Sequence, residues 1–184
     1  MLHMPIQKRS QGLFSRTSGG RLFSQLTVRE NVALSLRYHQ NLGAAEVESR
    51  VQKLIEAFEL EPWAELTPGA TGHNWQKRTG LARALALGPE VLLVDDALGG
   101  LDLRQVNWWL DFLDQLSKGH NLLEGRPVTL VVTTADLRPW RSRARQFAVL
   151  REKRLVVLGS WAEVEAASGE LLHEFLPRDR GARL

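Results

Sequence analysis

Two unbroken aliphatic runs constrain the fold of this chain more than any other feature of its sequence. They read "VLLVD" at 91–95 and "VTLVVTT" at 128–134. Such runs are typical of strands that are buried on both faces of a parallel sheet. The intervening stretch 103–118, which contains "WWLDFLDQL", has a helical pattern. Because strand and helix alternate, the sequence predicts an α/β fold around a parallel sheet.

Helical patterns also precede the first of these runs. Thr27 is a predicted N-cap, and Glu30 is placed to complete a capping box. A second helix is predicted within 43–60, and a third, within 75–88, ends at Gly88-Pro89. The second carries one apolar stripe, formed by Val47, Val51, Leu54, Ile55 and Phe58. We expect the first two helices to pack together.

The remaining segments complete one predicted domain over 1–176, with a frayed tail at 177–184. Residues 12–16 are a candidate for a short strand near the start. The stretch "RQFAVLREKRLVVLGS" predicts two strands joined at Glu152-Lys153, and short closing helices are predicted at 162–168 and 170–176.

Composition excludes several functions for this 184-residue chain. It has no cysteine, so disulfides and thiol chemistry are excluded, and it has no apolar run near the roughly 20 residues that span a bilayer. We expect a cytoplasmic protein, since no secretion signal is visible. The net charge is only +3, and no nucleic-acid partner is expected. Seven basic residues cluster between Arg138 and Arg154, either as a solvated face or as a surface for phosphate groups.

The carboxylates that follow the first aliphatic run are the main candidates for chemistry. Asp95 and Asp96 lie at the carboxyl end of a predicted parallel strand, where open α/β sheets place ligands. Asp95 is a candidate for holding magnesium through a water, and Asp96 for orienting an attacking water. The structural alternative is that the two acids cap the next helix and its loop.

These segments resemble the ATP-binding subunit of ABC transporters over most of residues 12–160. "LARALALGPEVLLVDD" is similar to the helix after the signature loop and the Walker B strand, and "GLD" at Gly100, Leu101 and Asp102 is similar to the D-loop. "GGRLFSQLTVRENVALSL" resembles the stretch after the Q-loop, particularly in the branch that serves phospholipid-handling MCE-type systems. The resemblance implies that Asp95 binds magnesium and that Asp96 occupies the position of the family's catalytic glutamate.

The fold implied by the resemblance is a partial P-loop NTPase of the ABC type. Its parallel sheet would carry an inserted helical subdomain at about 27–88, followed by a Walker B and D-loop core at about 89–160. The N-terminal strand and the P-loop helix would be absent, since no stretch of the chain matches the Walker A pattern G-x-x-x-x-G-K-[ST].

Other family positions are also altered. Ser18 occupies the Q-loop glutamine position, and Ala135 occupies that of the switch histidine. The signature loop "LSGG" is replaced by Thr71, Gly72, His73 and Asn74. Because that loop presents small residues and bare N–H groups to a γ-phosphate held by the opposite subunit, His73 and Asn74 are expected to crowd the approach.

A partner surface is predicted just ahead of the first helix. Leu22, Phe23 and Leu26 correspond to the region where the family contacts a membrane permease. The alternative is that Phe23 is a hydrophobic staple for the helix that starts at Thr27.

The sequence therefore predicts a degenerate ABC-type subunit with little or no ATP hydrolysis of its own. It would be peripheral on the inner face of the membrane, bound to a permease of a transport system with a lipid as candidate cargo, and it would pair with its own copy or with a competent ATPase. ATP and magnesium are its cofactors by resemblance. Two alternatives stay open: an active ATPase whose Walker A region is missing from this chain, and an adaptor for protein or anionic lipid.

Overall fold

A computed structural model describes residues 11–14, 22–39 and 42–166. Ser18, the predicted helix at 170–176 and the tail at 177–184 lie outside the described residues. The helices and strands in chain order are β1 (Gln11–Phe14), α1 (Val28–His39), α2 (Ala44–Ala57), η1 (Glu61–Trp63), η2 (Pro68–Ala70), α3 (His73–Leu85), β2 (Val91–Asp95), α4 (Leu103–Lys118), η3 (Asn121–Leu123), β3 (Thr129–Thr133), η4 (Arg138–Trp140), β4 (Phe147–Arg151), β5 (Arg154–Gly159) and α5 (Trp161–Ala166). The chain divides into two compact units, Met1–Thr133 and Thr134–Leu184.

The first unit is built around a parallel sheet in the order β1-β2-β3. Leu92 pairs with Gly12 on one side and with Leu130 on the other, so β2 is the central strand. The parallel sheet is confirmed, and so is the short first strand, which begins one residue earlier than the predicted 12–16.

Burial along the sheet differs from the prediction. Leu92 and Val94 are buried, whereas the alternate side chains Leu93 and Val131 are 40% and 50% exposed. Successive side chains of a strand project to opposite faces. The prediction that both strands are buried on both faces is therefore wrong, because an unbroken aliphatic run reports hydrophobicity and not which faces other elements cover.

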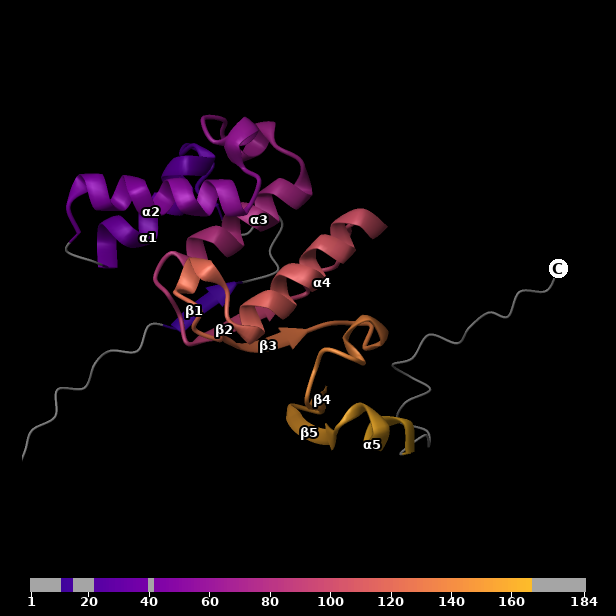
Figure 1. The fold of residues 1–184 in the computed structure, drawn as a ribbon. Helices are drawn as coiled ribbons and strands as arrows, with labels where there is room; N and C mark the ends of the chain where they lie inside the picture. Colours follow the sequence, from indigo (N-terminus) through magenta and orange to yellow (C-terminus); the bar gives the residue numbers. More distant parts are fainter. Residues whose placement is uncertain (1–10, 15–21, 40–41, 167–184) are drawn as a thin grey trace, which may run out of the picture. The chain divides into compact units, whose positions relative to one another are not determined.

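Helices α1, α2 and α3 form a helical layer in which α1 packs against both of the others (Figure 1). The predicted capping box is confirmed, since the Thr27 backbone N–H donates to Oε2 of Glu30 at 2.8 Å and the Glu30 backbone N–H donates to Oγ1 of Thr27 at 3.1 Å. The five stripe residues of the 43–60 region are all buried.

Helix α4 begins with a second capping box. The carboxylate of Asp102 accepts from the backbone N–H of Gln105, and the Gln105 side chain accepts in turn from the Asp102 N–H. Asp102, and not Asp95 or Asp96, is therefore the N-cap of this helix, while the alternative that the two acids hold the preceding loop stays a prediction.

The second unit contains an antiparallel hairpin of β4 and β5, followed by α5. Glu152 and Lys153 connect the strands with positive φ angles of 49° and 62°, which confirms the predicted turn. Leu150 faces Leu155 across the strands, and both side chains are exposed. The single domain expected over 1–176, with its helical and core parts, stays a prediction.

Candidate functional site

The two adjacent acids lie where the central strand of the sheet ends. The carboxylate of Asp95 accepts a hydrogen bond from the hydroxyl of Thr133, the last residue of β3. Asp96 follows with a left-handed φ of 47°, and its backbone N–H donates to the carbonyl of Thr133 at 3.0 Å. Aspartate tolerates this conformation better than most residues. Strand β3 thus fixes the backbone and one carboxylate of the pair.

The loop after Asp96 is held by a lysine that the sequence did not reveal. Lys77 of α3 is buried, and its ammonium donates to the carbonyls of Asp96, Ala97 and Gly99 at 3.0, 3.0 and 2.7 Å. A Cβ on Gly99 would overlap the Asp96 carboxylate, so a larger residue there would displace that carboxylate. The position of Lys77 four residues before buried Leu81 was the available signal, because that spacing places both on one face of the helix.

The residues at the altered signature positions do not form a loop throughout. Thr71 and Gly72 precede α3, whereas His73 and Asn74 are its first two residues. The Thr71 hydroxyl donates to the carbonyl of Pro68 at 3.0 Å. Helix α3 therefore begins two residues before the predicted start at 75, with Gly72 as its N-cap, and the assignment of these four residues to the signature positions stays a prediction.

Asn74 is part of the core. Its side-chain oxygen accepts a hydrogen bond from the indole N–H of Trp109 at 3.0 Å, and both residues are buried. Buried polar groups of this kind are almost always paired, and the pair ties the first turn of α3 to α4. Asn74, which replaces the second signature glycine, thus has its side-chain oxygen bound inside the protein.

The structure brings the altered signature positions next to the D-loop positions within this chain. A Cβ added to Gly100, whose φ is 73°, would lie 3.7 Å from the ring of His73. Leu101 and Asp102 follow directly, and Asp102 begins α4 as its N-cap. The ring of His73 therefore stands beside the backbone of the D-loop position.

A second cationic side chain that sequence reasoning missed lies on the same helix. The guanidinium of Arg78 stacks 3.5 Å above the ring centre of Trp108 and 4.7 Å from that of Trp75. It also pairs with the carboxylate of Glu59 at 2.7 Å. Burial lowers the pKa of Arg78, and the hydrogen bond and charge of Glu59 oppose that shift. Arg78 therefore has a packing role that connects α3 to α4.

Ala135 lies in the second unit, in the bend that follows β3. It is exposed and carries no polar side-chain atom. Nearby, Arg138 donates to the carboxylate of Asp136, and this contact lowers the pKa of Asp136. The contact between Arg138 and Asp136 therefore holds this bend, and the side chain at the switch position is only the methyl group of Ala135.

The predicted permease surface is an ordered turn ahead of α1. Phe23 is 53% exposed, while Leu22 and Leu26 are half-buried. A staple residue would pack against the first turn of the helix. Both the permease surface at these residues and the staple alternative for Phe23 stay predictions.

The described residues do not assemble a complete nucleotide site. Magnesium prefers oxygen ligands, and here they can offer it the Asp95 carboxylate beside the Thr133 hydroxyl. A phosphate cradle needs converging backbone N–H groups and a cation, but the three hydrogens of the nearby Lys77 ammonium already point to carbonyls. ATP therefore does not fit these residues alone.

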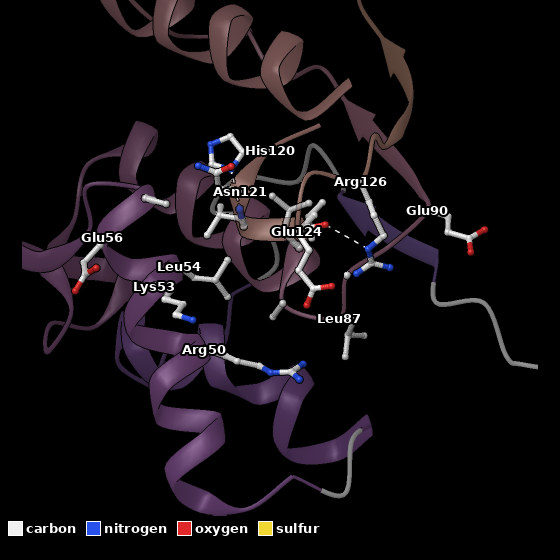
Figure 2. Close-up of a pocket in the computed structure, with 16 residues that line it drawn as sticks. Arg50, Lys53, Leu54, Glu56, Leu87, Glu90, His120, Asn121, Glu124 and Arg126 are labelled. Atoms are coloured by element: carbon white, nitrogen blue, oxygen red, sulfur yellow. Dashed lines mark hydrogen bonds between the residues drawn. The ribbon is translucent and has the colours of Figure 1, made fainter. Parts of the chain in front are cut away.

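An open groove of about 1000 Å³ lies elsewhere in the first unit, between α2, the end of α3 and η3 (Figure 2). Arg50 and Lys53 from α2 and Arg126 after η3 line it together with Glu56 and Glu124. Figure 2 shows charges of both signs around this space. None of the predicted site residues lines this groove, and its mixed charge favours no single class of ligand.

Comparisons with known proteins agree on one kind of relative, although no family model matches the chain. The chain is 32% identical over 165 residues to the sulfate/thiosulfate import ATP-binding protein CysA of Nephroselmis olivacea, covering 88% of this chain and 45% of that protein. It is 30% identical over 171 residues to the intermembrane phospholipid transport system ATP-binding protein MlaF of Escherichia coli, covering 93% and 60%. The chain thus spans about half the length of these relatives.

Solved structures give the same result for the fold. CbiO1 of Clostridium perfringens, part of the ABC transporter complex CbiONQ, aligns with a TM-score of 0.70 at 22% identity, over 86% of this chain and 60% of its own. The ATP-binding cassette MJ0796, a dimer bound to ADP and phosphate, aligns with a TM-score of 0.65 at 26% identity, over 82% and 63%. Among the described residues, no helix combines the length and hydrophobicity needed to cross a bilayer.

Proposed function

Because this chain belongs by homology and fold to the family of ABC transporter ATP-binding subunits, we propose that it serves a membrane permease as a subunit with little or no ATP hydrolysis of its own. Its role would be structural or regulatory. It would sit on the cytoplasmic face of the membrane and pair with its own copy or with a competent ATPase.

The observation that carries this proposal is the buried hydrogen bond between the side chains of Asn74 and Trp109. A signature loop can act on a phosphate only if small residues and free N–H groups reach it. Here the oxygen of Asn74 is bound to the buried indole of Trp109, and the ring of His73 stands beside Gly100. Ala135 supplies no side chain that could contact a γ-phosphate, and the chain has no Walker A sequence. All of these features support a subunit without its own turnover.

A lipid cargo is the finer part of the proposal. The resemblance to the phospholipid branch and the similarity to MlaF support it. Proteins named for import of spermidine and putrescine or of methionine match at 35% and 34% identity, so the cargo is tested separately. Phospholipid transfer by the permease complex with and without this chain, compared with uptake of those solutes, would decide it.

The test of the proposal is ATP turnover by the purified chain with magnesium. We expect no phosphate release above background, and no difference between the wild type and the Asp95→Ala variant. Asp111→Ala, which removes an exposed aspartate of α4, is the matched control. Turnover at the rate of an ordinary transport ATPase, abolished by Asp95→Ala and retained by Asp111→Ala, would show instead an active enzyme.

A further inference from the structure

The β4–β5 hairpin of the second unit presents apolar side chains to solvent on one of its faces. Leu150 pairs with Leu155 across the strands, and two positions away Ala148 pairs with Val157. Because successive side chains of a strand project to opposite faces, these two pairs lie on the same face, here called the aliphatic face. Leu150 is 73% exposed, Leu155 69% and Val157 58%. The aliphatic face is therefore largely open.

The same hairpin carries an excess of positive charge. Arg151 and Arg154 form the cross-strand pair next to the turn, and Lys153 lies in the turn itself. All three side chains are exposed, and none forms an ion pair with a residue that the structure describes. Residues 136–154 hold seven basic and two acidic side chains, a net charge of +5, whereas the whole chain has +3.

The pairing of two arginines has a cost in the free protein. Like charges that face each other directly across two strands destabilise a hairpin. An anion bound near Arg151 and Arg154 would offset their mutual repulsion. The long stems of arginine and lysine also let their charged ends reach beyond the strand that carries them, so these cations can meet anions beside the aliphatic face. The hairpin thus combines an open apolar face with cations that lack an internal counter-charge among the described residues.

This combination fits the surface of an anionic bilayer better than it fits other partners. Aliphatic side chains pack at the boundary between headgroups and acyl chains, and basic side chains meet the anionic headgroups. A second copy of this chain would bring the same positive charge against itself. Single-stranded nucleic acid is held by base stacking on aromatic rings, whereas the exposed apolar side chains of the hairpin are aliphatic. Charge and side-chain type together therefore favour lipid.

We propose that the β4–β5 hairpin is a binding surface for anionic lipid headgroups at a bilayer. Leu150 and Leu155 would lie at the boundary of the acyl chains, while Arg151, Lys153 and Arg154 contact the headgroups. The charges would bring the hairpin to the bilayer, and burial of the aliphatic face would hold it there. The proposal requires neither a permease nor ATP turnover.

Co-sedimentation of the full chain with lipid vesicles tests the proposal. Vesicles of phosphatidylcholine alone are compared with vesicles of phosphatidylcholine and phosphatidylserine in equal amounts. At about 0.1 M salt we expect at least about tenfold tighter binding to the vesicles that contain phosphatidylserine. At about 1 M salt most of this preference should be lost, because the screening length falls from about 10 Å to about 3 Å.

Two double variants separate the contribution of charge from that of apolar contact. Arg151→Gln/Arg154→Gln is expected to weaken binding to the phosphatidylserine vesicles at least about tenfold. Leu150→Thr/Leu155→Thr keeps side chains that favour strands, and we expect it to weaken binding by a similar factor while the preference for phosphatidylserine persists. Since all four side chains are exposed, the melting temperature of each variant should stay close to that of the wild type.

Arg37→Gln/Arg104→Gln is the matched control, since it removes two exposed cations from the first unit and leaves the same net charge as Arg151→Gln/Arg154→Gln. We expect it to bind almost as the wild type does. Equal weakening by these two variants would mean that only net charge matters and would overturn the proposal. A wild-type chain without preference for phosphatidylserine at about 0.1 M salt would also overturn it.

Two further outcomes would assign the hairpin to another partner and so contradict the proposal. A dimer in solution that is lost in Leu150→Thr/Leu155→Thr would assign the aliphatic face to a second copy of the chain. Tighter binding to single-stranded DNA than to vesicles, unchanged by the same substitutions, would assign the cations to nucleic acid. Because the vesicles contain no permease and no ATP is added, all of these results are independent of the proposed function.

Discussion

Two polar side chains near the altered site positions, those of Asn74 and Lys77, form hydrogen bonds inside the protein. Asn74 would crowd a phosphate if it faced outward, but its oxygen is bound to Trp109 in the core. Lys77 directs its ammonium to three carbonyls of the loop that carries Asp96. At both positions a polar group is satisfied inside the protein. The chemistry of the site is therefore limited by what these side chains already bind.

The hydrogen bond between Asn74 and Trp109 should be measurable as a coupling. Asn74→Ala leaves a buried indole N–H without an acceptor and should lower the free energy of unfolding by about 1–3 kcal/mol. Trp109→Phe removes the donor together with some packing. In urea unfolding of both single variants and the double variant, we expect an interaction energy of roughly 0.5–3 kcal/mol. Strictly additive effects would mean that the two groups do not interact.

At the scale of the helices, local sequence signals explain where α1 and α4 begin. Thr27 with Glu30 and Asp102 with Gln105 each satisfy backbone N–H groups that a helix start leaves free. The second of these capping boxes gives a structural role to an aspartate that resembles the D-loop acid. Asp102 is therefore needed for the start of α4 whether or not it meets a nucleotide.

Removal of the α4 cap should destabilise the protein even without any ligand. Asp102→Ala is expected to lower the free energy of unfolding by about 0.5–2 kcal/mol, because the N–H of Gln105 loses its acceptor. Asn107→Ala, an exposed change within the same helix, should have a much smaller effect. Circular dichroism during urea unfolding would measure both, and equal stability of the two variants would argue against the cap.

At the scale of the whole molecule, the two units differ in how their strands are supported. β2 has neighbours on both sides, and it buries Leu92 and Val94. The β4–β5 hairpin has one pairing, and most of its large apolar side chains are exposed. Two-stranded sheets are only marginally stable by themselves. Stability within the described residues should therefore be greatest in the first unit.

Hydrogen exchange of the full chain can test this difference. We expect the backbone amides of β2 to exchange at least about tenfold more slowly than those of β4 and β5, because their opening requires loss of the central sheet. Mass spectrometry of peptides that cover 91–95 and 147–159 would give the comparison. Equal protection of both peptides would show that the hairpin is as well supported as the central strand.

The sequence alone determined those features whose causes lie close together along the chain. The Thr27–Glu30 capping box, the apolar stripe of α2 and the turn at Glu152-Lys153 depend on spacings of a few residues, and all three are confirmed. The alternation of aliphatic strands and helices was also enough to predict the parallel sheet and, with the motifs around Asp95, the family.

Only the tertiary structure decided what is buried and what the altered site residues bind. Asn74 meets Trp109 across 35 positions, and Lys77 meets the loop after Asp96 across about 20, so a local pattern could at most indicate which helix face Lys77 lies on and not the partner of either residue. The exposure of Leu93 and Val131 likewise depends on which faces other elements cover. The physical reason is common to these cases: burial and long-range hydrogen bonds depend on how helices and strands pack, whereas caps and stripes depend on the geometry of one element.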